Sequence, residues 1–200
     1  MSKNMEKAAQ PKLWKRLLFS PKLLQKNHSH RIAYIAVMTA FCVAVNMLEI
    51  KLGGVQFSLT ICISVLTGMV LGGGAGFCAC FLGDLIGFMI HPFGEYSPWI
   101  GISTACMALF AGVILYVSGS PKEKMRLKLL AVCLLIFELC TCGITTVYLN
   151  QVWFKSMTYW ECLSYRLLVQ GQIYNSLFNS ILVVAGLPLL AKIKALRLFS

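Results

Sequence analysis

The chain has 200 residues, of which 58% are hydrophobic and only 12% are charged. A soluble globular domain carries about twice that share of charged residues, so the composition excludes a soluble enzyme or binding domain and indicates an integral membrane protein. The formal net charge of +11 would suit a nucleic-acid-binding protein, but the placement of the charges argues against that class.

The basic residues are concentrated in three segments. Fifteen of the eighteen Lys and Arg residues lie in 1–31, 119–128 and 192–200. Basic clusters beside apolar stretches mark the cytoplasmic side of a membrane protein. We therefore attribute the charge to topology in a lipid bilayer, and we expect no nucleic-acid partner.

The first segment, 1–31, is predicted to be a basic cytoplasmic region. Within it, 12–24 (KLWKRLLFSPKLL) mixes Lys and Arg with large apolar side chains. That mixture is typical of a short amphipathic helix lying on a membrane surface.

Six apolar stretches follow, and a membrane span needs about 20 such residues. In chain order they are 32–50, 55–72, 74–91, 99–118, 127–149 and 166–191. An even number of spans puts both termini on one side, so that all three basic segments fall in the cytoplasm. The sequence thus predicts an all-α membrane protein with six transmembrane helices over 32–191, and a basic cytoplasmic tail over 192–200.

The first span carries a stripe of small side chains. Ala36, Ala40 and Ala44 recur every fourth residue, which puts them on one face of a helix. Small residues let another helix approach closely. The stripe alone leaves open whether that helix belongs to this chain or to a partner.

Acidic and amide side chains also occur within or near the spans, namely Asn46, Glu49, Asp84 and Glu138. Ionisable groups in a span are costly and usually face the interior of the bundle. Asp84 has Gly83 and Gly87 nearby, which favours a role in tight helix packing over direct substrate contact, whereas Glu138 fits either role. One alternative is a membrane enzyme or sensor that uses Asp84 and Glu138 as an acid–base pair.

The predicted outer loops, 91–99 and 150–166, are rich in aromatic residues, and the sixth span begins with a polar face. Arg166 and Gln170 follow one stripe of that helix, and Gln172, Asn175 and Asn179 follow the neighbouring one. The Arg166 guanidinium can clamp a carboxylate or a carbonyl-rich ring through two parallel hydrogen bonds, or it can reach the membrane interface instead. The loop aromatics fit either an interfacial belt or stacking on a flat ligand.

Motifs for catalysis are missing from the sequence. It contains no P-loop, no H-E-x-x-H and no G-x-S-x-G, and its three histidines form no ligand cluster. Eight of the nine cysteines lie in apolar stretches, where a thiol behaves as a small hydrophobe. We expect no catalytic residue, no metal and no cofactor.

Several segments together resemble a known family. They are the alanine-striped RIAYIAVMTAFCVAVNMLEI, the glycine-rich turn after the second span, FLGDLIGFMI, GEYSPWIGISTA and YRLLVQGQIYNS. In this order, over about 31–190, they resemble the S components of energy-coupling factor (ECF) vitamin transporters, and the folate group most closely. The resemblance implies a non-enzymatic subunit of the bacterial cytoplasmic membrane that binds a vitamin from outside.

The resemblance also implies partners and a site. The partners are a transmembrane coupling subunit, which docks on Ala36, Ala40 and Ala44, and two cytoplasmic ATPases. Candidate ligand-binding residues are Asn46, Tyr96, Trp99, Tyr148, Gln151, Trp153, Arg166 and Gln170. Folate is the first ligand expected, but TTVYLNQVWF departs from the folate pattern, which leaves a queuosine precursor and a pyrimidine precursor as alternatives.

Overall fold

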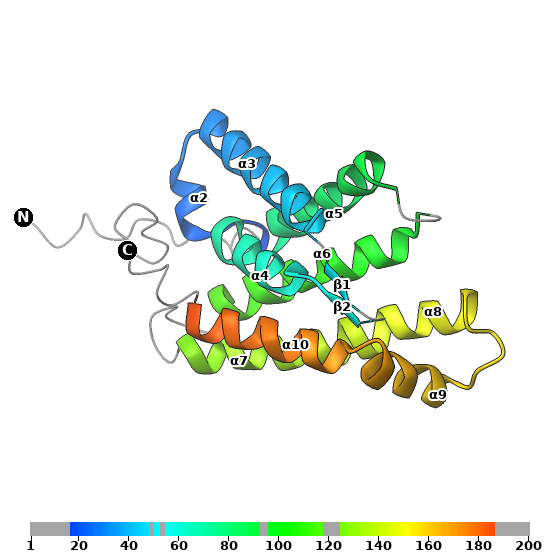
Figure 1. Cartoon of the computed structure of the whole chain (residues 1–200). Helices are drawn as coiled ribbons and strands as arrows, with labels where there is room; N and C mark the ends of the chain where they lie inside the picture. Colours follow the sequence, from blue (N-terminus) through cyan, green and yellow to red (C-terminus); the bar gives the residue numbers. More distant parts are fainter. Residues whose placement is uncertain (1–16, 49, 53–54, 93–95, 118–124, 187–200) are drawn as a thin grey trace, which may run out of the picture.

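The computed structural model describes residues 17–48, 50–52, 55–92, 96–117 and 125–186. The basic connection within 118–124 and the tail at 192–200 lie outside the described residues. The elements in chain order are α2 (Pro21–Gln25), α3 (His28–Asn46), β1 (Ile50–Leu52), β2 (Val55–Phe57), α4 (Thr60–Leu71), α5 (Gly73–Ile90), α6 (Pro98–Val117), α7 (Met125–Leu135), η1 (Ile136–Thr145), α8 (Thr146–Val152), α9 (Tyr159–Ser164), η2 (Tyr165–Val169), α10 (Gln172–Ile181) and η3 (Leu182–Gly186) (Figure 1).

The predicted all-helical membrane architecture is confirmed. Among the described residues, four helices are long and apolar enough to cross a membrane, and the longest is the continuous rod Met125–Val152 formed by α7, η1 and α8. A fifth candidate span is the pair Tyr159–Val169 and Gln172–Gly186, which bends by 57°. The bend falls at Gly171, whose φ of 69° is a left-handed conformation that glycine adopts without steric cost.

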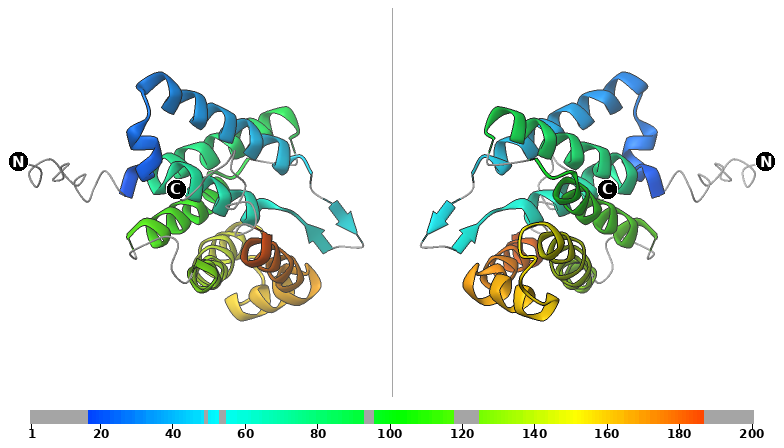
Figure 2. Two further views of the ribbon diagram at one scale, coloured as in Figure 1. Left: turned by 90° about the vertical axis from the view of Figure 1, so that its left-hand side faces the viewer. Right: turned by 90° about the vertical axis from the view of Figure 1, so that its right-hand side faces the viewer.

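The second predicted span, 55–72, differs from the observed structure. Its first residues form β2, which pairs antiparallel with β1 in the register Ile50↔Phe57, and the hairpin extends from the side of the bundle (Figure 2). The helix that follows, α4, has 12 residues and is therefore about 18 Å long, shorter than the hydrocarbon core of about 30 Å. The apolar run was long enough for a span, but the alternation in Val55-Gln56-Phe57 and the preceding Gly53-Gly54 are typical of a hairpin.

The short helix α4 forms the centre of the protein core. Eight of its 12 residues are buried, and Val65 and Met69 are completely so. They belong to a cluster with Leu115 of α6 and Ile136 of η1. A helix that is apolar on all sides is stable when other helices surround it, which explains how a helix too short for a span sits inside the bundle.

Glycines bring α4, α5 and α6 unusually close together. A Cβ at Gly68 would lie 2.3 Å from the Ala108 carbonyl oxygen, and one at Gly112 would lie 2.3 Å from the Gly73 nitrogen. Neither contact leaves room for a side chain, so this packing requires glycine at both positions.

Residues 17–25, which we call the N-terminal strap, pack against the bundle rather than lying apart from it. The Ser20 backbone N–H donates to the Leu71 carbonyl oxygen at 2.8 Å, and its hydroxyl donates to the Val70 carbonyl oxygen at 2.7 Å. Leu23 is buried in a cluster with Leu71 and Ala75. In the described part of the segment 12–24, which was predicted to lie on the membrane surface, Leu23 thus finds apolar partners in the bundle.

Candidate functional site

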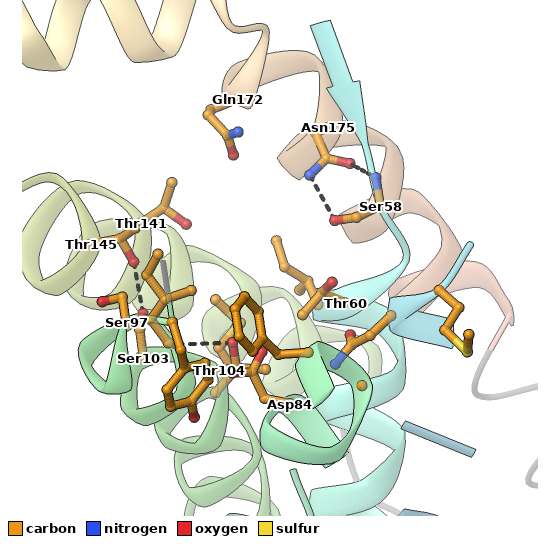
Figure 3. Close-up of a pocket in the computed structure, with 18 of the residues that line it drawn as sticks. Ser58, Thr60, Asp84, Ser97, Ser103, Thr104, Thr141, Thr145, Gln172 and Asn175 are labelled. Carbon is orange, nitrogen blue, oxygen red and sulfur yellow. Dashed lines mark hydrogen bonds between the residues drawn. The ribbon is translucent and has the colours of Figure 1, made fainter. Parts of the chain in front are cut away.

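A cavity of about 320 Å³ opens between the helices (Figure 3). It is lined from the C-terminal parts of α3 and α5, the N-terminal parts of α4 and α6, and from η1, η2 and α10. These helix ends lie at the opposite end of the bundle from the N-terminal strap. If the basic segments are cytoplasmic, as the positive-inside rule predicts, the cavity faces the outside.

Arg166 contributes the positive charge of the cavity. The residue is only 5% exposed. Its Nη1 donates to the Thr141 carbonyl oxygen at 3.1 Å and to the Thr146 hydroxyl. Its Nε is buried without a hydrogen-bond partner among the described residues. One edge of the guanidinium is thus fixed by the protein, while the N–H of Nε is a donor that the described residues leave unused.

Asp84 contributes the negative charge from another wall. It belongs to α5 and is drawn near the bottom of Figure 3, whereas Gln172 is drawn near the top. Tyr96, in the segment that joins α5 to α6, packs its ring against that of Phe88 in a tilted arrangement, with the centroids 5.0 Å apart and an angle of 49° between the planes. Burial raises the pKa of Tyr96, and the charge of Asp84 raises it further, so the phenol stays protonated at neutral pH.

Hydroxyl groups hold the wall between α6 and η1 together. Thr145 donates to the Ser103 hydroxyl at 2.9 Å, and Ser103 donates to the Cys140 carbonyl oxygen at 3.2 Å. These bonds join two helices that both line the cavity, so they fix the width of the site on this side.

The two asparagines of α10 have a structural role in the described protein. Asn175 Oδ1 accepts from the Ser58 N–H at 3.1 Å, and Asn179 Oδ1 accepts from the Cys62 N–H at 3.1 Å. Asn179 Nδ2 also donates to the Ser58 carbonyl oxygen at 2.7 Å. The polar stripe predicted on the sixth span therefore satisfies the backbone at the start of α4, an end that helices leave without internal partners.

The structure brings some of the predicted ligand-binding residues together and separates others. Those that line the cavity are Asn46, Tyr96 and Arg166. Those outside its lining are Trp99, Tyr148, Gln151, Trp153 and Gln170, and of these Trp99 and Trp153 are more than half exposed. Glu138 is exposed on η1 and also outside the lining, so Asp84 and Glu138 do not form a pair.

Other lining residues had not been predicted as binding residues. Asp84, Gly87, Phe88 and His91 all line the cavity, and they recur along α5 at the spacing of one helix face. That periodicity is visible in the sequence and could have identified the cavity-facing side of the third span.

The alanine stripe of α3 faces away from the bundle. Ala36, Ala40 and Ala44 are all exposed, whereas Thr39 and Cys42 of the same helix are buried. The small face is therefore open to a neighbour in the membrane.

Comparison with known proteins agrees with this architecture. The family described as "ECF-type riboflavin transporter, S component" matches residues 26–195. A crystal structure of FolT bound with folic acid is similar in fold, with a TM-score of 0.65 and 21% sequence identity, over 82% of this chain and 93% of that one. No curated protein matches the chain. Since the family match covers most of its length, this chain belongs to this family of ECF transporter S components.

Proposed function

We propose that the cavity holds a flat heteroaromatic vitamin captured from outside the cell. The observation that carries this proposal is the buried Arg166, whose Nε has no partner among the described residues in a cavity of about 320 Å³. That volume is typical of small-molecule sites, which combine apolar walls with a few polar groups that fix orientation. Phe88, Ile100 and Met107 supply such walls.

Riboflavin is the first candidate ligand, in place of the folate that the sequence favoured. Among the described lining residues, the charge of Arg166 is balanced by that of Asp84, and His91 is the other basic group. A nearly neutral cavity suits a neutral ligand, because a buried charge needs a partner of opposite sign. Riboflavin is neutral, whereas folate carries two carboxylates. The family description also names riboflavin.

Folate remains the second candidate. The fold matches that of FolT bound with folic acid, and the cavity contains an arginine that can pair with one carboxylate.

A binding experiment separates the two candidates. The protein is purified from cells depleted of vitamins and its melting temperature is measured with riboflavin, folic acid or a panel of other vitamins and nucleobase precursors. A ligand that binds the folded state must raise the apparent stability. Riboflavin is expected to give the largest rise; a rise with folic acid alone would reverse the ranking, and no rise with any compound would contradict the binding function.

For transport, we propose that the exposed face of Ala36, Ala40 and Ala44 docks on the coupling T subunit. This chain contains no P-loop and therefore no motif for hydrolysing ATP. The ATPases that act with the T subunit supply the energy for transport. S components of this family pair with a T subunit and ATPases, and the exposure of the stripe on α3 supports the same use here.

A further inference from the structure

A carboxylate, a phenol and a glycine meet on one wall of the cavity. A Cβ placed on Gly101 of α6 would lie 2.9 Å from Asp84 Oδ2 and 3.0 Å from the Tyr96 hydroxyl. Both polar atoms thus lie against Gly101, and they fit there because glycine has no side chain. Asp84 and Tyr96 also line the cavity, so the cluster belongs to its surface.

Two hydroxyls of residues that line the cavity have no hydrogen-bond partner among the described residues. They are the Tyr96 phenol and the Ser97 hydroxyl, both with buried oxygen atoms. Buried polar groups are nearly always hydrogen-bonded. Tyr96 and Ser97 both line the cavity, so a molecule held there lies next to both residues.

The charged groups on the two walls require different hydrogen-bonding groups of a ligand. Arg166 offers only N–H donors, so it selects an acceptor such as a ring carbonyl. An ionised Asp84 offers only acceptors, so it selects an N–H or NH₂ donor. A ligand that satisfies both must carry an acceptor, such as a ring carbonyl, together with an N–H or NH₂ donor.

We propose that Asp84, assisted by Tyr96, is a ligand-binding residue that accepts a hydrogen bond from a ring N–H of the vitamin and so selects heterocycles with an amide or imide edge. This inference rests on the vitamin-binding function proposed above. It gives Asp84 a recognition role in place of the packing role that the flanking glycines suggested.

The test compares riboflavin with 3-methylriboflavin, in which the imide N–H is replaced by N–CH₃. Wild-type protein is expected to bind riboflavin at least about tenfold more tightly than 3-methylriboflavin, because the methyl compound loses a hydrogen bond to a charged group. Asp84→Ala should weaken riboflavin binding by a similar factor and reduce the preference between the two ligands to less than about twofold. Glu138→Gln, which changes a span carboxylate outside the cavity, should leave both affinities unchanged.

Asp84→Asn separates recognition from folding. Its amide oxygen can still accept from the ligand, so the preference for riboflavin over 3-methylriboflavin should persist at lower affinity. A purely structural Asp84 would instead lower the melting temperature of the ligand-free protein and leave the preference intact in Asp84→Ala, which would overturn the inference while the vitamin-binding function stood.

Two other outcomes have separate meanings. If wild-type protein binds folic acid and not riboflavin, the same comparison is made with folic acid and its N3-methyl derivative, and the same loss of preference in Asp84→Ala is required. If wild-type protein binds no vitamin, the proposed function fails and this inference fails with it.

Discussion

In the proposed function, Arg166 links the stability of the bundle to the ligand site, because one guanidinium serves both. Its Nη1 donates to Thr141 and Thr146 of the neighbouring rod, while Nε has no partner among the described residues and is the donor that we propose for the ligand. We predict that Arg166→Lys weakens vitamin binding about 10- to 100-fold, because an ammonium group cannot serve both sides at once and a charge-assisted hydrogen bond contributes about 1.5–3 kcal/mol.

Binding titrations and melting temperatures check this prediction. Arg166→Ala should lose both affinity and stability, since it removes the donor to two buried oxygens. Lys155→Ala serves as the control, because Lys155 is an exposed basic residue of the outer loop. Unchanged affinity in Arg166→Lys would place the ligand elsewhere in the cavity.

Asn179 is predicted to matter for stability rather than for ligand selection. It is fully buried and bonds the Cys62 N–H and the Ser58 carbonyl oxygen. Asn179→Ala leaves both backbone groups without a partner, at a cost of about 1–3 kcal/mol each. The melting temperature of the ligand-free protein should fall by about 5–10 °C, while Leu177→Ala, at an exposed position of the same helix, should change it little. An unaltered melting temperature would mean that water replaces the amide.

At the scale of single residues, the sequence predicts polar positions better than it predicts their roles. The spacing of Asn175 and Asn179 correctly indicated one polar helix face, but their function depends on where α4 begins, which is a tertiary relation between segments more than 100 residues apart. Asp84 shows the converse case: glycines nearby suggested packing, yet it lines the cavity.

The N-terminal strap is held by the geometry of a single glycine. Gly72 has a φ of 95°, and a Cβ there would lie 2.3 Å from the Ser20 nitrogen. Gly72→Ala therefore introduces both backbone strain, roughly 1–2 kcal/mol, and a clash with backbone atoms. We predict that the strap detaches and that residues 17–25 exchange their amide hydrogens faster, as measured by mass spectrometry.

Gly186→Ala is the matched control for the strap, because a Cβ at Gly186 would meet nothing within 4 Å. It should leave the exchange of the strap unchanged. Equal exchange in the two variants would show that the hydrogen bonds of Ser20 hold the strap without help from the turn.

At the scale of elements, helices were predictable wherever a long apolar run was uninterrupted. The rod Met125–Val152 and the helices α3, α5 and α6 correspond closely to predicted spans. The predictions failed where an apolar run hides a change of structure. The summed hydropathy of 55–72 is blind to the alternation of apolar and polar residues that forms β2. The summed hydropathy of 166–191 is likewise blind to the bend at Gly171.

For the whole molecule, the sequence predicted the class of protein but not its ligand. Composition, the basic clusters and the spans all follow from membrane physics, which acts on every residue in the same way. In our proposal, ligand choice depends on how Asp84, Tyr96 and Arg166 combine in one cavity, and those residues come from three separate segments of the chain. The cavity and the exposed stripe of α3 also use different surfaces, so binding and docking should be separable by mutation.

Ala40→Trp tests that separation. Ala40 is exposed in the middle of the stripe, where an indole would hold a partner helix away from a face that small residues keep smooth. We predict that the purified variant binds vitamin like the wild type, while cells that carry it with the coupling subunit and ATPases lose vitamin uptake and the variant no longer co-purifies with them. Ala131→Trp, an equal change at an exposed position of α7, should preserve uptake. Because the control adds the same bulk to a membrane-facing helix, uptake that survives in Ala40→Trp would assign docking to another face, and uptake lost in both variants would point to a general defect in membrane insertion.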